Sequence, residues 1–426
     1  MEFCELMEAY MDCRKNKRYT REALSFEIDC ERNLMELYRD LTGGTYRIGP
    51  STVFVVTKPV KREVFAASFR DRIVQHWIIL RLNPLFEKEF IYDSYACRKN
   101  KGTLFGVKRI RRFIARCSEG YTKDCYVLRC DIKGFFMNID RSILLGIANR
   151  FVQDKYHGPD KKFIISLLSM IIMHDPTENC RVNSIPKLWD GLPPDKSIFT
   201  NNGMPMPNGF LPAAYAHRKQ PKGIPIGNLT SQIFANLYLN GMDHYIKHDL
   251  GEKYYGRYMD DFIVVHRSRE RLLELTYIFR NYLADKLKLQ LHPNKVTLMH
   301  YSKTVNFLGV GIKKGVLLTG KRTKAGLYNT LYHYNISAGK RDLNFDELEA
   351  FRQSMNSYLG LAVHYRSYTM RKDVFEKFSP ALKRLAYGRN YSKVMLRKKR
   401  SLPDDSWYST LQCRRGPHRK TAGNDI

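Results

Sequence analysis

The sequence predicts an α+β fold, with helical segments on either side of a centre built from short paired strands. Apolar residues recur with helical spacing among charged ones in five segments: 1–45, 70–90, 141–174, 229–250 and 270–289. Short apolar runs joined by turn residues indicate antiparallel hairpins in three places: 52–67, 254–266 and 304–318. From residue 321 the chain is again helical in pattern and is strongly basic.

Local signals set the elements of the first part of the chain. The glycine pair Gly43-Gly44 ends the first helical segment. Residues 52–57 form an apolar run that stops before Pro59, which predicts a strand, and residues 62–67 predict its antiparallel return.

Two later segments differ sharply in composition. Residues 126–131 are an apolar strand that ends in the carboxylate of Asp131. Residues 175–223 are rich in proline, asparagine and glycine, so we expect a long loop with little regular structure of its own. A loop of that length inside a domain is usually functional or disordered.

Composition narrows the class of partner. The 426 residues are 43% hydrophobic, which is enough for a large core, and 72 lysines and arginines against 42 acids give a formal charge of +30. Nucleic acid is the favoured polyanionic partner, and an anionic membrane surface is the alternative. No apolar run reaches the roughly 20 residues of a spanning helix, and the N-terminus lacks a signal-peptide core. Nine scattered cysteines without a paired CxxC motif indicate reduced thiols in a cytoplasmic protein and no zinc site.

The local signal for chemistry is an adjacent pair of acids, Asp260-Asp261, at the expected tip of the 254–266 hairpin. Such a pair alone is usually a turn or a helix cap. Asp131 changes that interpretation, because it ends a separate strand. Two strand-borne carboxylate sites side by side suit a centre for phosphoryl transfer with two Mg²⁺ ions, in which Asp131 and Asp260 bridge the metals and Mn²⁺ can substitute.

Seven blocks in order carry a resemblance to a known family. They are Lys58–Gln75, Asp93–Thr103, Asp131–Phe136, Ile224–Gln232, Tyr258–Asp261, His292–Lys295 and Asn306–Gly309. In this order and at these spacings the chain resembles a prokaryotic reverse transcriptase. The resemblance implies an RNA-directed DNA polymerase with a right-hand fold of fingers, antiparallel-sheet palm and helical thumb.

The resemblance also implies domain limits and a metal site. The N-terminal helical segment and fingers would cover residues 1–125, the palm 126–320 with its long loop at 175–223, and the thumb and basic tail 321–426. The implied metal-binding residues are Asp131, Ile132, Asp260 and Asp261, of which the three aspartates are catalytic.

Further site residues follow from the resemblance. The residues expected to bind the deoxynucleoside triphosphate are Arg62, Arg70, Arg72, Phe135, Phe136, Gly227, Ser231, Gln232 and Lys295. The ring of Phe136 would leave no room for a 2′-hydroxyl, whereas Lys295 would neutralise triphosphate charge. The alternatives are an ordinary core phenylalanine, a solvated surface lysine, and a salt bridge between Arg72 and Asp71. The implied primer grip is Phe307, Leu308 and Gly309, which as a mere hairpin would look the same.

Basic and aromatic residues are interleaved in the C-terminal region, a composition that suits stacking on bases and contact with phosphates. About half of its tyrosines should belong to the core. The residues expected to bind RNA, including three near the fingers, are Lys58, Arg98, Lys99, Arg366, Arg371, Arg397, Lys398, Lys399 and Arg400. For the tail itself, a disordered charged segment is the alternative.

Departures from the common family pattern narrow the resemblance. The block Ile226-Gly227-Asn-Leu-Thr-Ser231-Gln232, together with Leu192–Phe199, resembles reverse transcriptases of diversity-generating retroelements and of bacterial defence systems. An intron-encoded role is disfavoured, because the roughly 100 residues after the primer grip show no HNH-like or cysteine-rich segment.

Three hypotheses follow. The first is synthesis of cDNA on a dedicated structured noncoding RNA in the bacterial cytoplasm, for antiphage defence or for protein diversification. We favour defence because the thumb and tail are long and self-contained. The second is a catalytically silent RNA-binding scaffold, against which the intact aspartates and Phe136 argue. The third is template-independent or protein-primed synthesis. An accessory protein or a homo-oligomer stays open as a partner.

Overall fold

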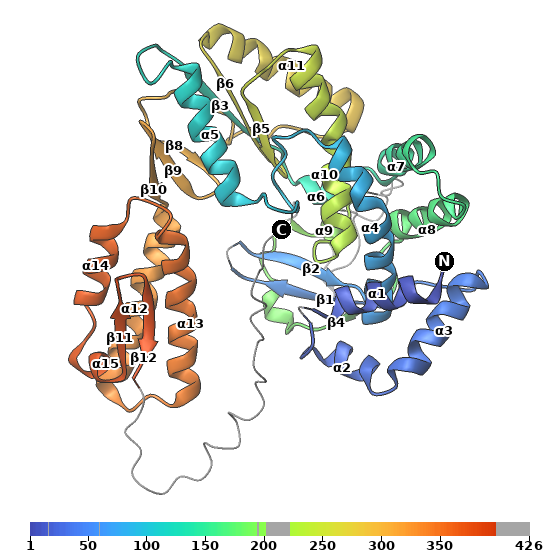
Figure 1. The fold of residues 1–426 in the computed structure, drawn as a ribbon, viewed down its shortest axis with the longest axis horizontal. Helices are drawn as coiled ribbons and strands as arrows, with labels where there is room; N and C mark the ends of the chain where they lie inside the picture. Colours follow the sequence, from blue (N-terminus) through green and yellow to red (C-terminus); the bar gives the residue numbers. More distant parts are fainter. Residues whose placement is uncertain (16, 59, 194–195, 202–221, 398–426) are drawn as a thin grey trace, which may run out of the picture. The chain divides into compact units, whose positions relative to one another are not determined.

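A computed structural model describes the whole chain except residues 16, 59, 194–195, 202–221 and 398–426. The chain divides into two compact units, Met1–Val316 and Leu317–Ile426. Helices and mainly antiparallel sheets occur together, which confirms the predicted α+β class (Figure 1). Among the described residues, no helix combines the length and the apolar character needed to cross a membrane.

The first unit begins with three short helices in the predicted helical stretch 1–45. The hydroxyl of Thr20 caps the second helix by accepting the Ala23 N–H, and Gly43 follows the third as predicted. Their apolar sides pack on a long fourth helix, in which Ser68 caps the start by accepting the Asp71 N–H. The bounds are α1 Phe3–Arg14, α2 Arg21–Glu27, α3 Cys30–Thr42 and α4 Phe69–Glu89.

A small sheet follows, with the predicted hairpin at its centre. Strands β1 Ser51–Val56 and β2 Arg62–Ala66 pair antiparallel, with Thr52 opposite Ala66. A third strand, β4 Cys180–Val182, pairs with β1 in parallel, so the strand order is β2-β1-β4.

The prediction of little regular structure over 175–223 is therefore partly wrong. Besides β4, this stretch contains the 3₁₀ helix η1 Pro186–Leu188 and the short helix α9 Ile198–Asn201. The physical reason is burial, since apolar side chains of the stretch pack against the inner face of β1 and β2. The residues of this small core are Val53, Val55, Phe65, Met137, Trp189, Leu192, Ile198 and Phe199.

The main sheet of the first unit has four antiparallel strands in the order β5-β6-β3-β7. β6 is buried at five consecutive positions, which requires cover on both of its faces, and α5 and α11 pack on the sheet (Figure 1). The bounds are β3 Tyr126–Asp131, β5 Tyr255–Tyr258, β6 Asp261–His266, β7 Thr297–His300, α5 Thr103–Cys117 and α11 Arg269–Leu287.

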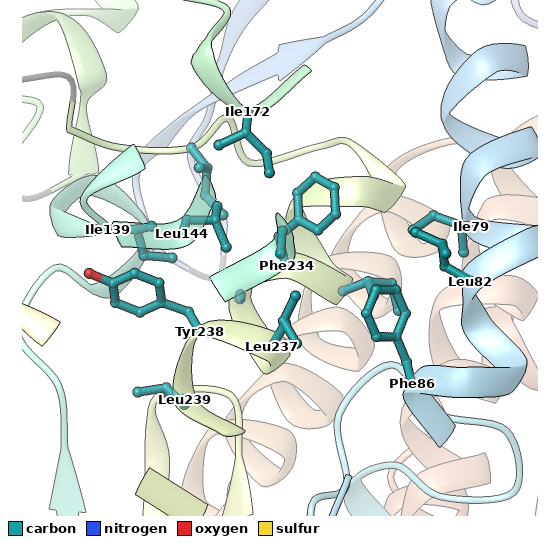
Figure 2. Packing of buried hydrophobic residues seen from close by; sticks show 14 of the residues in the cluster. Ile79, Leu82, Phe86, Ile139, Leu144, Ile172, Phe234, Leu237, Tyr238 and Leu239 are labelled. Atoms are coloured by element: carbon teal, nitrogen blue, oxygen red, sulfur yellow. The ribbon is translucent and has the colours of Figure 1, made fainter. Parts of the chain in front are cut away.

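The main core of this unit surrounds helix α10, Leu229–His244. Figure 2 shows Phe234 and Leu237 of α10 between Leu82 and Phe86 of α4 on one side and Leu144 on the other. α10 continues into one π-helical turn, Tyr245–Asp249, so the helix predicted over 229–250 is confirmed. The helices beside it are α6 Phe135–Asn138, α7 Arg141–Lys155 and α8 Lys161–Met173.

The region predicted as one hairpin over 304–318 contains three strands. β8 and β9 form the hairpin, and a second turn at Lys314-Gly315, where both residues have positive φ, leads into β10. The sequence signal for the extra strand was short, and its first residue ends the first unit. The bounds are β8 Val305–Phe307, β9 Val310–Lys313 and β10 Val316–Thr319.

The second unit is helical, as predicted, but it also contains a hairpin that the sequence did not predict. Val394 of that hairpin is buried in the unit's own core, and Asn390 and Tyr391 turn the chain with positive φ. Of the eight tyrosines in the described part of this unit, four pack on the core, as expected: Tyr328, Tyr334, Tyr358 and Tyr391. The bounds are α12 Lys321–Lys340, α13 Phe345–Ala362, α14 Tyr368–Glu376, α15 Pro380–Leu385, β11 Ala386–Arg389 and β12 Lys393–Leu396.

Gly227, which lies just before helix α10, packs closely against strand β2. Its φ of 126° lies in the region that favours glycine, and a Cβ at this position would lie 2.6 Å from the carbonyl oxygen of Phe65 and 2.8 Å from Val64 Cγ1. The close backbone approach at this glycine is made to β2, and the predicted contact of Gly227 with the nucleotide stays a prediction. Two hydrogen bonds flank it, from the Phe65 N–H to the Ile226 carbonyl and from the Ala67 N–H to Asn228 Oδ1.

We predict that Gly227→Ala destabilises the protein by about 2–4 kcal/mol, because the new methyl group meets the β2 backbone and φ becomes unfavourable. Urea unfolding measures this change. Gly146→Ala is the matched control, since nothing lies within 4 Å of a Cβ built at that position of α7. It should be neutral or gain up to about 1 kcal/mol. Equal stability of the two variants would contradict the packing described here.

Candidate active site

The three predicted aspartates meet at one end of the four-stranded sheet. Asp131 is the last residue of β3 and stands directly opposite Asp261, the first residue of β6. Asp260 occupies the turn just before β6, and its carbonyl accepts the Ile132 N–H at 3.2 Å. The structure therefore brings all four predicted metal-site residues together, although they come from two segments about 130 positions apart in the chain.

The turn that carries Asp260 is strained, and a hydrogen bond from Arg257 holds it in place. Tyr258 pairs with Asp261, which leaves only Met259 and Asp260 between the strands, and Met259 has a φ of 52°. The guanidinium of Arg257 donates to the Met259 carbonyl at 3.0 Å. A non-glycine residue with positive φ persists only when the surrounding structure fixes it, and such residues are frequent in active sites.

Arg257 is itself fixed by α10, although sequence reasoning did not single it out. Its side chain is 1% exposed and donates to Asp243 at 2.8 and 2.5 Å and to Asn236 Oδ1 at 3.2 Å. The hydroxyl of Tyr255 donates to the same Asp243 at 2.6 Å. A charged residue in a strand that is otherwise buried was the available signal, but no local pattern identifies its partners on the preceding helix, 14 and 21 positions earlier in the chain.

Electrostatic repulsion marks this end of the sheet. Burial, together with the smaller effect of the neighbouring charge of Asp131, raises the pKa of Asp260 to about 6. Burial also raises the pKa of Asp261, while its pairing with Arg129 opposes that change. The site thus holds more negative charge than its own side chains neutralise.

Two cations lie against the carboxylates. Arg129, on β3, binds both oxygens of Asp261 at 2.9 and 2.7 Å. Lys295 places its ammonium 2.9 Å from Asp131 Oδ2, and half of its side chain is exposed. The predicted Lys295 thus lies beside the carboxylates, and its contact with the triphosphate stays a prediction. Arg129 was missed, although an arginine two residues before Asp131 faces the same side of the strand.

The donor set fits a hard divalent cation. Asp131 and Asp260 offer carboxylate oxygens, whereas Ile132, whose side chain is buried, could offer only its main-chain carbonyl. Within the described residues, no group of three or more histidine, cysteine or acidic side chains is spaced to enclose a metal ion. Mg²⁺ needs no such cage, because it usually binds one or two carboxylates and completes its shell with water and substrate phosphates.

The two predicted phenylalanines beside the site differ in burial. Phe135 is buried, whereas Phe136 is only half-buried and meets Phe135 edge to face at 5.5 Å. Gly134 opens their helix α6 in the left-handed region, with a φ of 53°. The main-chain carbonyl of Phe136 accepts the Ile224 N–H at 2.9 Å. An ordinary core phenylalanine would be covered, so the exposed part of Phe136 suits contact with a ligand.

The predicted arginines near β2 are held by acids of the N-terminal helices. Arg70 pairs with Asp40, and the ion-pair partner of Arg72 is Glu22 at 3.9 Å. The alternative pairing of Arg72 with Asp71 is wrong, because the Asp71 oxygens accept hydrogen bonds from Tyr46, Gly49 and Ser68. Arg62 is the first residue of β2. A triphosphate contact by these three arginines stays a prediction.

The start of α10 carries two further residues predicted to bind the triphosphate, Ser231 and Gln232. Asn228 precedes the helix, and Ser231 is 4% exposed inside its first turn. Gln232 is half-buried, and its side-chain oxygen accepts from the Cys97 thiol at 3.0 Å. Ser231 is therefore a packing residue in this structure, and the predicted contact of Gln232 with the triphosphate stays a prediction.

The predicted primer grip is a tight hairpin turn. Phe307 is buried, whereas Leu308 and Gly309 have φ values of 50° and 78° between β8 and β9. Positive φ at both positions is the geometry of a type I′ turn, which usually avoids leucine. The strained Leu308 is consistent with a functional turn, and its contact with a primer stays a prediction.

The residues predicted to bind RNA fall into four groups. Lys58, Lys99 and Arg366 are exposed. Arg98 is 5% exposed and ties a loop together through Glu87 and three main-chain carbonyls, so its predicted role in RNA binding finds no support here. Arg371 and Arg397 donate to carbonyls of the second unit's own hairpin and helix. Lys398, Lys399 and Arg400 lie outside the described residues.

Comparison with known families gives the class of protein. The family described as reverse transcriptase (RNA-dependent DNA polymerase) matches residues 60–312, which is more than half of the chain. The matched span holds the four-stranded sheet and all three aspartates. The chain therefore belongs to the reverse transcriptase family, whose enzymes are RNA-directed DNA polymerases that use divalent metal ions.

Individual relatives are distant. The chain is 21% identical over 332 residues to Protein YkfC of Escherichia coli (strain K12), covering 69% of this chain and 73% of YkfC. It is 23% identical over 351 residues to the group II intron-encoded protein LtrA of Lactococcus lactis subsp. cremoris, covering 72% of this chain and 54% of LtrA. It thus spans about half the length of LtrA. Apo telomerase from Candida tropicalis is a similar solved structure, with a TM-score of 0.46 and 14% identity, covering 78% of this chain and 59% of that one.

We predict that Asp260→Asn stabilises the metal-free protein by about 1–3 kcal/mol at pH 7.5. The folded-state pKa of Asp260 is raised, so its ionised form costs stability above pH of about 6, and this cost vanishes as the pH falls toward 4. The gain should vanish over the same range. Chemical denaturation with chelator present measures it, and Asp285→Asn, at an exposed position of α11, is the control. A gain that does not change with pH would count against the repulsion.

Proposed function

We propose that this chain copies a dedicated structured noncoding RNA into cDNA, using two Mg²⁺ ions held by Asp131 and Asp260. The observation that carries the proposal is the convergence of three carboxylates at one sheet end, with Lys295 beside Asp131 and the half-buried ring of Phe136 nearby. The fingers, palm and thumb would correspond to residues 1–125, 126–320 and 321–426. The proposed setting is the bacterial cytoplasm, as cysteine usage predicts.

The chemistry would be in-line attack of a primer 3′-hydroxyl on the α-phosphate of a deoxynucleoside triphosphate. When bound, the metal ions would lower the pKa of that hydroxyl and neutralise the triphosphate, and Mn²⁺ could replace Mg²⁺. Asp131 and Asp260 would hold them, and Asp261, paired with Arg129, would keep the charge and geometry of the turn. Lys295 would move from Asp131 toward the leaving pyrophosphate.

The double variant Asp260→Ala, Asp261→Ala should lose at least about 1,000-fold in the rate of DNA synthesis. The reason is that the metal ions that would bind the triphosphate and activate the 3′-hydroxyl need these carboxylate oxygens. Primer extension on an RNA template measures it. Mg²⁺ should raise the melting temperature of the native protein and not that of the double variant. Asp285→Asn serves again as the control for a lost surface carboxylate. Undiminished synthesis by the double variant would refute the proposal.

The role of Phe136 gives a second test of the same site. Phe136→Ala should relax the preference for deoxynucleotides over ribonucleotides by about 10- to 100-fold, since the ring no longer opposes a 2′-hydroxyl. The ratio of kcat/KM for the two nucleotides measures this preference. Phe135→Leu, which keeps a buried apolar side chain, is the control and should leave the ratio unchanged. Equal ratios in both variants would make Phe136 a packing residue.

The biological purpose we propose is antiphage defence, and mutagenic cDNA synthesis in a diversity-generating retroelement is the alternative. Support for a structured RNA partner comes from the charge of +30 and from exposed aromatic side chains in the second unit, where Tyr332 is 64% and Tyr368 60% exposed. Sequencing the RNA and DNA that copurify with the native protein separates the purposes. Adenine-targeted errors would indicate diversification, whereas concatemers or homopolymers would indicate defence.

The same experiment addresses the remaining alternatives. A catalytically silent scaffold would copurify with RNA and yield no DNA that depends on Asp260. A product attached covalently to protein would indicate priming by a side-chain hydroxyl, and product without a matching RNA would indicate template-independent synthesis. An accessory protein or a second copy of the chain would appear in the purified complex.

A further inference from the structure

Residues 175–224, here called the insertion, leave and rejoin the fold at a single place. Asp175 at its start pairs with the buried guanidinium of Arg141 at 3.3 Å. Arg141 also donates at 2.7 Å to the carbonyl of Gly223 at its end, and the Gly223 N–H donates to the Ile139 carbonyl at 2.8 Å. Both ends of the insertion are therefore fastened where α6 passes into α7, directly after the predicted sugar-selecting ring.

The described middle of the insertion is hydrogen-bonded to the β1–β2 hairpin. β4 pairs with β1, and the Val55 N–H of β1 donates to Ser184 Oγ at 3.0 Å. The ammonium of Lys61 donates to the Asp190 carbonyl at 2.5 Å. The insertion thus bridges the β1–β2 hairpin and the α6–α7 junction.

Glu63 forms the buried part of this bridge. It lies in β2, is fully buried, and accepts hydrogen bonds from Ser197 Oγ at 2.6 Å and from the Ile198 N–H. Burial raises the pKa of Glu63 to about 7. A buried carboxylate is expensive where an apolar side chain would fit. Because both hydrogen bonds go to adjacent residues, Ser197 and Ile198, we infer that Glu63 fixes the position of this segment.

The segment held by Glu63 packs directly on α6. Ile198 and Met137 belong to the same small core, and a Cβ built on Gly223 would touch both, at 3.4 Å from Ile198 Cγ1 and 3.2 Å from the Met137 carbonyl oxygen. Met137 follows Phe136 in α6. On the other side of the segment, Lys196 is near enough to Asp260 for its charge to lower that carboxyl's pKa. The segment therefore lies at the edge of the active site.

We propose that Glu63 is a positioning residue for nucleotide selection, which holds Ser197 and Ile198 against α6 and thereby fixes the ring of Phe136. This inference rests on the proposed polymerase function and deepens it, because it makes Ser197 and Ile198 part of the support of the sugar-selecting ring. The ligand concerned is the ribose of the incoming nucleoside triphosphate.

The test compares three full-length variants in primer extension. Glu63→Ala should raise the KM for deoxynucleotides about fivefold, change kcat by no more than about twofold, and lower the preference for deoxynucleotides about tenfold. Glu63→Gln should stay within about twofold of the native protein, because its amide oxygen still accepts the Ile198 N–H. Ser184→Ala is the matched control, since it removes one side-chain hydrogen bond between the insertion and β1 and leaves the hydrogen bonds of Glu63 next to α6 in place.

A merely structural role for Glu63 predicts a different pattern. If Glu63→Ala and Ser184→Ala alter the sugar preference equally, or if neither alters it, the proposal is overturned. Should Glu63→Ala fail to fold, Ser197→Ala takes its place. It removes one of the two hydrogen bonds, so a smaller loss of preference in the same direction is expected, and an unchanged preference overturns the proposal.

A second readout needs no catalysis and so separates this inference from the proposed function. Hydrogen exchange of the amides of residues 135–139 in the free protein should be faster in Glu63→Ala than in either Ser184→Ala or the native protein. Equal exchange in all three overturns the positioning role. If the native protein makes no DNA while the exchange rates differ as expected, the proposed function fails and the tie between Glu63 and α6 stands.

Discussion

The antiparallel register of β3 against β6 is the constraint on which the site depends. It sets Asp131 opposite Asp261 and leaves Asp260 in the turn, and apolar pairs behind them, such as Cys130 with Phe262, hold it. A slip by one residue would turn every side chain of β3 to the other face of the sheet. Because β6 is buried on both faces, such a slip would bury charge and expose core, so the register is strongly specified.

A second buried interaction stabilises the costly turn at the end of this register. The ion pair of Arg257 with Asp243 connects α10 to the β5–β6 hairpin, and the same guanidinium reaches the Met259 carbonyl. Removal of one partner of a buried pair is far more destabilising than its net contribution suggests. The repelling aspartates at the end of the sheet therefore lower the stability of the fold. The hydrogen-bonded network of Arg257 and Asp243 next to them keeps the turn rigid.

Local sequence patterns were sufficient for the parts of the site that lie within one strand or one turn. Asp131 at a strand end and the acid pair at a hairpin tip were predictable, because spacing and alternation decide both. The partners of Arg257 and Glu63 were not, since they lie outside the hairpin of each residue, at 14 positions for Asp243 and 134 for Ser197, and no local pattern identifies them. The β11–β12 hairpin was hidden for another reason: basic and helix-favouring residues surround the one buried valine that defines it.

The two ends of the insertion are held together, so the number of residues between them does not affect the geometry of the active site. Asp175 and Gly223 are fastened to the same buried arginine, so the ends stay together whatever number of residues connects them. The entropic cost of a longer closed loop grows only with the logarithm of its length, about 0.6 kcal/mol for each doubling. A change in the number of residues between Asn201 and Lys222 would therefore leave both fastened ends, and with them the α6–α7 junction beside Phe136, in place.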